Sequence, residues 1–307
     1  MAPALIAIVG PTASGKSALA LRLVREHSGE IVSCDSLQVY RGLDIGSAKA
    51  TAAERREVPH HLVDVVDPSE PFSAADYGRL GRQALADIAE RGRLPIVAGG
   101  TGLYLRALLE GLFEGPSRDE RLRRRLEGLA ERFGAVRLHR VLRRADPVAA
   151  ARIPAQDRVR VVRALEVLRA TGRPISAHHA LETESLSGFD VMTVGLGPER
   201  DRLRQRVERR TAEMFARGLL DEVRGLLARG YGPELRPLRA IGYRQAVAVI
   251  REEMDPESAR RDIVTETMRY AKRQMTWFRH QSRPVWAADA DAARGLATTW
   301  LAERARR

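Results

Sequence analysis

The sequence predicts an α/β protein built on a parallel sheet flanked by helices, with an inserted all-helical domain and a helical C-terminal region. Three observations predict it. A glycine-rich loop follows the first apolar run, further apolar runs alternate with helical stretches up to Leu112, and the alternation then stops for a long helical stretch. Strands that alternate with helices form parallel sheets, and a helical stretch between two such strands indicates an insertion.

The first strand is the unbroken apolar run at residues 4–9, which is typical of a strand buried on both faces. The next eight residues complete the pattern G-x-x-x-x-G-K-[ST]: Gly10, Pro11, Thr12, Ala13, Ser14, Gly15, Lys16 and Ser17. A helix opens at Ser17, and backbone N–H groups at a helix N-terminus bind phosphate oxygens. Lys16 adds a positive charge, and the Ser17 hydroxyl can hold Mg²⁺. The sequence therefore predicts a P-loop NTPase-like sheet that binds a phosphate compound.

The remaining elements follow in order. Four more apolar runs predict strands at residues 30–33, 61–66, 94–98 and 191–196, and a helix is expected at residues 74–91. Residues 118–187 are helical only, so we expect a discontinuous core of residues 1–117 and 188–307 around an inserted domain of residues 118–187. Residues 200–283 and 288–307 predict further helices.

Composition narrows the class of protein. The 307 residues carry a formal net charge of +12, which favours a polyanionic partner such as nucleic acid, although an arginine-rich proteome would give the same excess. The single cysteine, Cys34, excludes an intramolecular disulfide. The chain carries no apolar stretch of membrane-spanning length and begins directly in the first strand, so we expect a cytoplasmic protein with no membrane partner.

Polar residues follow two of the strands at the sheet edge where open α/β sheets bind ligands. Asp35 comes after the second strand, where it could bind Mg²⁺ through water, act as a general base, or only cap the following segment. Gly99 and Gly100 end the fourth strand, and either a ligand approaches their backbone or a tight turn needs them. Thr101 is expected to point its hydroxyl into the crevice. A guanine-reading Asn-Lys-x-Asp motif is absent, so a GTPase is not expected.

Beyond these patterns, the chain resembles a known family. The segment DSLQVYRGLDIGSAK at residues 35–49 and the loop GPTASGKS at residues 10–17 are similar to motifs of the tRNA dimethylallyltransferases (tRNA isopentenyltransferases). The similarity continues in residues 58–62, 72–77, 99–104, 146–150, 163–167, 240–245 and 272–279, and so covers essentially the whole chain.

The resemblance implies transfer of a dimethylallyl group from dimethylallyl diphosphate to N6 of the adenosine 3′ of the anticodon, in tRNAs that read UNN codons. The P-loop would then grip a diphosphate leaving group with the help of Lys16 and Mg²⁺. Asp35 matches the residue that removes the proton from the acceptor amine, and Thr101 matches a position near the acceptor and the phosphates. We expect a monomer of bacterial type whose partners are dimethylallyl diphosphate and the anticodon stem-loop of tRNA.

The same resemblance implies which residues contact tRNA. They are Asp35, Ser36, Leu37, Gln38 and Thr101 around the flipped base; Arg123, Gln156, Asp157, Arg158, Val159 and Arg160 in the insertion; Arg239, Ala240, Ile241, Gly242, Tyr243 and Arg244; and Lys272, Arg273, Gln274, Met275, Thr276, Trp277, Phe278 and Arg279. The neighbouring Arg121, Arg124 and Arg125 make the position of Arg123 uncertain by one or two residues.

The helix at residues 267–279 also supports RNA binding on physical grounds. Met268, Ala271, Met275 and Phe278 form an apolar stripe, and Arg269, Lys272, Arg273 and Arg279 lie off that stripe. The alternative interpretation is a basic face that is merely solvated.

Three other functions remain open from the residues. A P-loop kinase of a small metabolite would share the loop and the acid after the second strand, an adenylate isopentenyltransferase would act on free AMP or ADP, and a non-catalytic P-loop protein could simply bind RNA.

Overall fold

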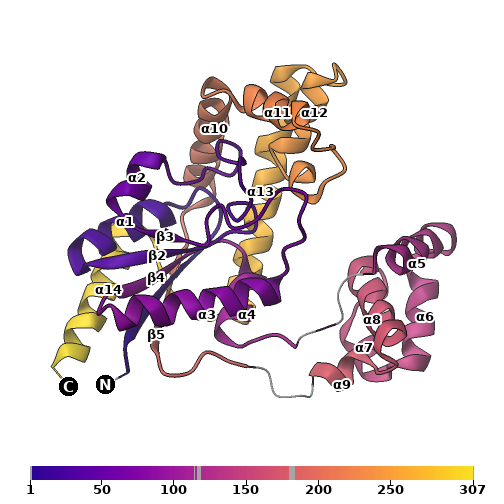
Figure 1. Ribbon diagram of the computed structural model, residues 1–307, viewed down its shortest axis with the longest axis horizontal. Helices are drawn as coiled ribbons and strands as arrows, with labels where there is room; N and C mark the ends of the chain where they lie inside the picture. Colours follow the sequence, from indigo (N-terminus) through magenta and orange to yellow (C-terminus); the bar gives the residue numbers. More distant parts are fainter. Residues whose placement is uncertain (1, 114, 116–118, 180–183, 307) are drawn as a thin grey trace. The chain divides into compact units, whose positions relative to one another are not determined.

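The computed structural model describes residues 2–113, 115, 119–179 and 184–306 (Figure 1). The chain divides into two compact units, one made of Met1–Leu109 with Ser185–Arg307, and the other of Glu110–Glu184. The predicted start of the insertion at residue 118 lies outside the described residues. The structure places the first boundary earlier, at Glu110, and the second at Glu184 rather than at residue 187. We refer to the two parts as the core unit and the helical unit.

In the described part of the core unit, six parallel strands form one sheet, which confirms the predicted α/β class (Figure 1). Their order is β3 (His60–His61), β2 (Gly29–Cys34), β4 (Leu94–Gly99), β1 (Ala4–Val9), β5 (Asp190–Leu196) and β6 (Val285–Ala287). The register pairs Ile6 of β1 with Ile96 of β4 and with Met192 of β5. Because all strands run the same way, the P-loop after β1 and Asp35 after β2 lie at one edge of the sheet.

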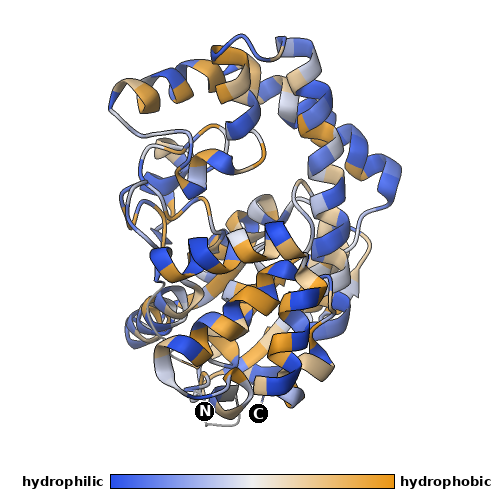
Figure 2. Cartoon of the chain, turned by 90° about the vertical axis from the view of Figure 1, so that its right-hand side faces the viewer, coloured by the Kyte–Doolittle hydropathy of each residue, from blue (hydrophilic) through white to orange (hydrophobic). Residues whose placement is uncertain are grey.

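Side chains of the central strands alternate between two apolar layers. Leu5, Ala7 and Val9 face a layer that includes α3 (Ala74–Glu90), α4 (Gly102–Leu109) and Phe278 of α13 (Pro256–Gln281). Ile6 and Ile8 face the opposite layer, covered by α1 (Lys16–His27) and α14 (Ala290–Ala305). Figure 2 shows hydrophilic and hydrophobic residues on the same helices, as expected when each helix covers a sheet with one face only.

Two strands differ from the prediction. The run at residues 61–66 is not a strand beyond its first residue, since β3 covers His60–His61 only. Leu62 and Asp64 adopt φ values of 59° and 57°, so the chain turns there instead of staying extended. The short strand β6 was not predicted, because three residues at the edge of a sheet carry almost no periodic signal.

The C-terminal helices pack over the carboxyl edge of the sheet. They are α10 (Arg200–Ala216), α11 (Leu219–Ala228), the 3₁₀ turn η1 (Arg236–Arg239), α12 (Tyr243–Ile250) and α13. Helix α10 packs on α13, and α11 packs on α12. The short helix α2 (Ala52–Glu57) precedes β3. None of the described helices combines the length and apolar character that crossing a membrane requires.

The helical unit has its own small core. Its helices are α5 (Glu120–Phe133), α6 (Ala135–Ala145), α7 (Pro147–Arg152), α8 (Arg158–Thr171) and α9 (Ile175–His179). Leu138 and Leu142 of α6 pack with Val161 and Leu165 of α8. The buried carboxylate of Glu166 accepts hydrogen bonds from Arg163, and from Arg123 across to α5, so an ion-pair cluster joins two helices of this unit.

Candidate active site

The P-loop turns tightly between β1 and α1. Gly15 has a φ of 102°, a left-handed conformation that favours glycine, and it places Lys16 at the first position of α1. The Lys16 ammonium donates to the Pro11 carbonyl at 2.6 Å. Burial and the nearby Arg210 guanidinium lower the pKa of Lys16 to about 7, although the Asp35 carboxylate acts in the opposite direction. The loop therefore holds a cation whose charge is costly until an anion joins it.

Two cavities open at this edge of the sheet. The larger, about 630 Å³, is lined by the loop residues from Thr12 to Ser17 and by arginines of α10. The smaller, about 310 Å³, has a more apolar wall that includes Leu37, Val207, Pro237 and Ile263. The residues that line both cavities are Thr12, Asp35, Ser47, Arg210, Met214 and Tyr270. The cavity at the P-loop and the more apolar cavity thus share Asp35 in their linings.

Asp35 combines a local role with exposure to both cavities. Its Oδ1 accepts the N–H of Leu37 at 2.8 Å, which stabilises the turn after β2. The sequence left open whether Asp35 caps the local backbone or serves chemistry, and the observed position is compatible with both. Burial, with a smaller contribution from the Asp35 charge, raises the pKa of the nearby Tyr77 phenol, which stays protonated.

Thr101 lies behind Asp35 and supports its loop. Its Oγ1 accepts the N–H of Ser36 at 3.1 Å, and its own N–H donates to the Cys34 carbonyl. The prediction pointed this hydroxyl into the crevice, but the structure directs it at the backbone of the Asp35 loop. Tyr270, which lines both cavities, hydrogen-bonds with the Thr101 side chain, and burial with the Asp35 charge raises the pKa of Tyr270 to about 12.

Gly99 and Gly100 are required by close contacts within the protein. A Cβ on Gly99 would collide with the carbonyl of Cys34, and one on Gly100 would collide with the Gln274 amide. Gln274 is buried and joins three elements: its Oε1 accepts the Thr12 N–H at 2.8 Å, and its Nε2 donates to the Gly100 carbonyl at 2.8 Å. Helix α13 therefore fixes the P-loop to the end of β4.

Sequence reasoning missed two arginines of α10. Arg210 donates to the Thr12 hydroxyl at 3.0 Å, and Arg206 donates to the Ser14 carbonyl at 3.1 Å. Burial lowers the pKa of Arg210, but an arginine stays charged at neutral pH. The only available signal was their i, i+4 spacing, which puts both on one helix face next to the apolar Leu203, Val207 and Met214.

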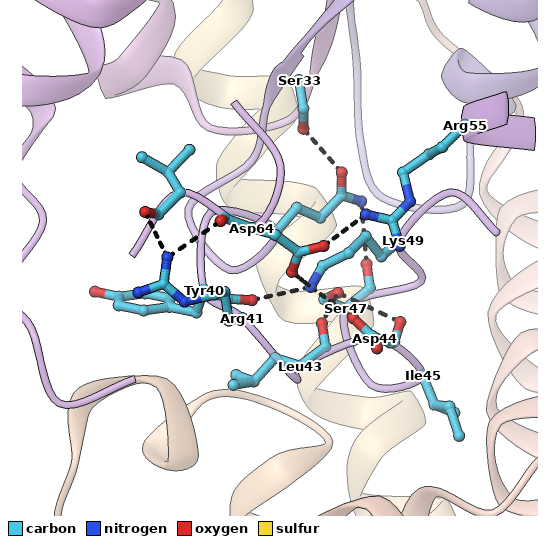
Figure 3. A network of polar contacts seen from close by, with 12 residues as sticks. Ser33, Tyr40, Arg41, Leu43, Asp44, Ile45, Ser47, Lys49, Arg55 and Asp64 are labelled. Carbon is cyan, nitrogen blue, oxygen red and sulfur yellow. Dashed lines mark hydrogen bonds and ion pairs between the residues drawn. The ribbon is translucent and has the colours of Figure 1, made fainter. Parts of the chain in front are cut away.

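The loop between β2 and α2 forms one wall of the site and is held by a network of polar contacts (Figure 3). Gln38 accepts from the Ser33 hydroxyl at 2.8 Å and donates to the carbonyls of Ser47 and Ala48 at 3.3 Å. The fully buried Lys49 ammonium binds the carboxylates of Asp44 at 2.6 Å and Asp64 at 2.7 Å. These contacts occupy both ends of the Gln38 amide, which was expected to contact a base.

The other residues expected to contact tRNA divide by exposure. On the core unit Arg239, Arg244, Lys272, Arg273, Thr276 and Arg279 are exposed, and Ala240, Ile241, Met275 and Trp277 are partly so. In contrast, Tyr243 and Phe278 are buried in the core, and Gly242 and Gln274 are also buried. Tyr243 and Phe278 line neither cavity, whereas Gly242 lines the apolar cavity and Gln274 lines the phosphate cavity.

The helical unit shows the same division. Arg123 is paired with Glu127 at 3.0 Å and with Glu166, and its side chain is only 16% exposed. Its neighbours Arg121, Arg124 and Arg125 are exposed. Gln156, Arg158, Val159 and Arg160 are exposed at the start of α8, whereas Asp157 caps that helix by accepting the Arg160 N–H.

A magnesium ion would fit this donor set only with help from a ligand. Ser17 is exposed in the first turn of α1, and Ser17 and Asp35 line the same cavity. Among the described residues, no cluster of three or more His, Cys, Asp or Glu side chains could hold a metal ion. Mg²⁺ commonly takes one or two protein oxygens and completes its shell with water and substrate phosphates, and Ser17 and Asp35 are suited to that mode.

Fold and site together define a P-loop protein of the α/β class, in which an anion-binding cavity is joined to a second, apolar pocket at a carboxylate. Comparison with known proteins then gives the family. The model of the IPP transferase family matches residues 38–281, and that of the isopentenyl transferases matches residues 3–64. The chain belongs to the IPP transferase family, whose bacterial members are the tRNA dimethylallyltransferases.

Individual relatives support this assignment. The chain is 52% identical to the tRNA dimethylallyltransferase of Solibacter usitatus over 93% of this chain and 92% of that protein, and 50% identical to that of Geobacter metallireducens over 92% and 91%. The tRNA isopentenylpyrophosphate transferase structure from Bacillus halodurans matches with a TM-score of 0.70 and 40% identity, over 98% and 96% of the two chains. A eukaryotic dimethylallyltransferase acting on tRNA matches with a TM-score of 0.74 and 30% identity, over 90% of this chain and 70% of that one.

Proposed function

We propose that this protein transfers the dimethylallyl group of dimethylallyl diphosphate to N6 of adenosine 37 in tRNA, releasing diphosphate. The observation that carries the proposal is the meeting of two cavities at Asp35. One cavity has the cations and backbone donors that a diphosphate needs, and the other has the apolar walls that a base and an allyl chain need. A transfer between two ligands requires such a common point.

In this proposal the P-loop and α10 bind the diphosphate group. Lys16, Arg206 and Arg210 line the same cavity as the first residues of α1, whose backbone N–H groups are free to bind an anion. As the C1–O bond of dimethylallyl diphosphate breaks, the bonding electron pair stays with the diphosphate oxygen. Fixed positive charges stabilise the departing anion, which is often the largest catalytic contribution.

In this proposal Asp35 acts on the acceptor, adenine N6. The carbon left by the diphosphate has allyl-cation character and forms a bond with adenine N6, whose proton must then leave. Asp35 lines both cavities, which supports a role as the general base that takes that proton. Thr101 assists indirectly, because its hydroxyl holds the Ser36 N–H and so the position of the loop.

Mg²⁺ belongs to the proposal as a partner of the diphosphate. Ser17 and Asp35 are the residues that would hold it, together with substrate oxygens. When bound, the ion would neutralise part of the charge that develops on the leaving group.

The tRNA side of the proposal rests on exposed basic residues. Arg273, Lys272 and Arg279 are exposed on α13, whose other face carries the buried Gln274 that braces the P-loop. Phosphate contacts from such residues would orient the anticodon stem-loop, and the target adenine would leave its stack to reach the apolar cavity. Arg158 and Arg160 on the helical unit are proposed as further contacts. The choice of tRNAs that read UNN codons also belongs to this proposal.

A direct assay tests the proposal. The protein is incubated with Mg²⁺, labelled dimethylallyl diphosphate and unmodified tRNA, and the digested tRNA is examined for N6-dimethylallyladenosine. We expect transfer by the wild type and a loss of about 10²–10⁴-fold in turnover for Asp35→Asn, with tRNA binding retained. Absence of transfer to any tRNA that reads UNN codons would refute the function. Phosphoryl transfer from ATP, or equal activity on free AMP, would favour a kinase or an adenylate isopentenyltransferase.

A further inference from the structure

Part of the lining of both cavities is a loop with no helix or strand of its own. Within residues 44–48, Gly46 and Ser47 line the apolar cavity, and Ile45, Ser47 and Ala48 line the phosphate cavity. A loop that lines both cavities sets the distance between the two ligands. Its position must therefore be fixed by contacts from other elements.

One carboxylate from α11 makes three of these contacts. Glu222 Oε2 accepts the N–H groups of Asp44 at 2.9 Å and Ile45 at 2.7 Å, and Glu222 Oε1 accepts that of Gly46 at 3.2 Å. Three consecutive backbone N–H groups that converge on one anion form a backbone nest, which binds carboxylates as it binds phosphates. Hydrogen bonds to an ionised acceptor are about twice as strong as neutral ones.

A buried tyrosine forms a hydrogen bond with that carboxylate. The Tyr243 hydroxyl donates to Glu222 Oε1 at 2.8 Å, and the Tyr243 side chain is fully buried. Burial and the Glu222 charge raise the pKa of Tyr243 well above its usual range, so the phenol keeps its proton and remains a donor. The Tyr243 ring also packs against Gly46 so closely that a Cβ on Gly46 would lie 2.5 Å from it. Glu222 and Tyr243 thus hold the loop by hydrogen bonds and by contact.

We propose that Glu222 is a positioning residue for the transfer reaction, acting through the backbone of residues 44–46 to hold the wall between the two cavities. The inference rests on the proposed transfer function. In the described part of the chain, Glu222 lines neither cavity. It can therefore affect the geometry of the bound ligands, but it does not touch the reacting atoms. A displacement of about 1 Å in such a wall costs about 10²-fold in rate.

Three variants test the proposal, two at Glu222 and one in the loop that Glu222 holds. Glu222→Ala removes the carboxylate, and Glu222→Gln keeps an oxygen that can serve two of the three N–H groups. Gly46→Ala displaces the same loop by contact with Tyr243. The matched controls lie on α11: Asp221→Asn, an exposed acid paired with Arg224, and Gly225→Ala, where an added methyl meets no atom within 4 Å. Transfer to tRNA, the Kd of inorganic diphosphate, and amide exchange at residues 44–46 are measured for each.

For Glu222→Ala and Gly46→Ala we expect kcat to fall about 10²-fold, with the diphosphate Kd within about twofold of wild type because the P-loop is untouched. Glu222→Gln should recover most of kcat, and both controls should behave as wild type. Faster amide exchange at residues 44–46 should accompany each loss.

Two results would overturn the assignment. One is amide exchange at residues 44–46 of Glu222→Ala that is as slow as in the wild type. This result would refute the role of Glu222 whatever the transfer assay shows. The other is a parallel loss of diphosphate affinity and kcat, which would indicate a general structural role. Absence of transfer in the wild type would instead count against the proposed function, and the exchange measurement would still decide the role of Glu222.

Discussion

Lys16 gives a prediction whose size follows from the structure. Burial and Arg210 lower its pKa from 10.5 to about 7, so charging this amine in the folded protein costs about 5 kcal/mol more than in water. A bound diphosphate supplies the negative charge that the site lacks, and should restore the pKa toward its usual range. Ligand binding above pH 7 should therefore be coupled to proton uptake by Lys16.

The expected stoichiometry is close to one proton. At pH 8 only about a tenth of Lys16 is charged before binding, so binding of dimethylallyl diphosphate should take up about 0.9 proton per molecule. The terminal phosphate group of the ligand titrates near pH 6 and contributes little at pH 8. At pH 6 Lys16 is already about nine-tenths charged, and the uptake assigned to it should nearly vanish.

Calorimetric titration in buffers of different ionisation enthalpy measures this uptake, without tRNA so that no transfer occurs. The control is Lys16→Arg, whose guanidinium is charged at every pH used. The reasoning is refuted if wild type and Lys16→Arg differ by less than about 0.3 proton at pH 8.

The same pKa affects folding with a defined sign. Between pH 7 and 10.5 the unfolded chain binds more protons at Lys16 than the folded chain does, so stability should rise with pH across this window in the wild type.

Three further substitutions test other contacts. Arg210→Ala should raise the KM for dimethylallyl diphosphate about 10–100-fold, because it removes a charged hydrogen-bond donor from the P-loop. Arg204→Ala, on the exposed face of α10, should leave the KM unchanged. Equal effects of the two substitutions would contradict the role of Arg210. Gln274→Leu should lower the free energy of unfolding of the core unit by about 2–4 kcal/mol, because the buried Gly100 carbonyl and the Thr12 N–H lose their partner. Urea unfolding followed by tryptophan fluorescence measures this loss. A loss below about 1 kcal/mol would show that the Gln274 hydrogen bonds are dispensable for stability. Arg273→Ala should weaken tRNA binding and reduce the slope of log K against log salt by about 1, whereas an unchanged slope would mean that this face of α13 is only solvated.

Much of the fold could be predicted from local sequence. The strands β1, β2, β4 and β5 were located to within a residue or so, because buried parallel strands carry unbroken apolar runs. The failure at residues 61–66 has a local cause as well: an apolar run looks extended, but Leu62 and Asp64 turn into the left-handed region so that Asp64 can reach Lys49 and Arg55. The extended conformation that an apolar run favours is overridden there by ion pairs with residues 9 and 15 positions earlier in the chain.

The site was predicted less completely than the fold. The P-loop and Asp35 follow strands directly, so parallel topology alone brings them to one edge of the sheet. Arg206, Arg210, Gln274 and Glu222 come from helices more than a hundred residues away, and their spacing is the same as that of any solvated helix. Burial reverses the interpretation of Gln274, which lies in a basic segment expected to face RNA and yet braces the P-loop.

The sequence by itself determined the α/β class, the phosphate loop, the carboxylate after the second strand and the family, because each depends on residues adjacent along the chain. Only the tertiary structure decided that Asp35 lines two cavities, that arginines of α10 lie beside the P-loop, and which basic side chains are exposed. The physical reason is that a cavity is formed by surfaces of several elements, and a side chain that faces it is distinguished from a solvated one only by packing.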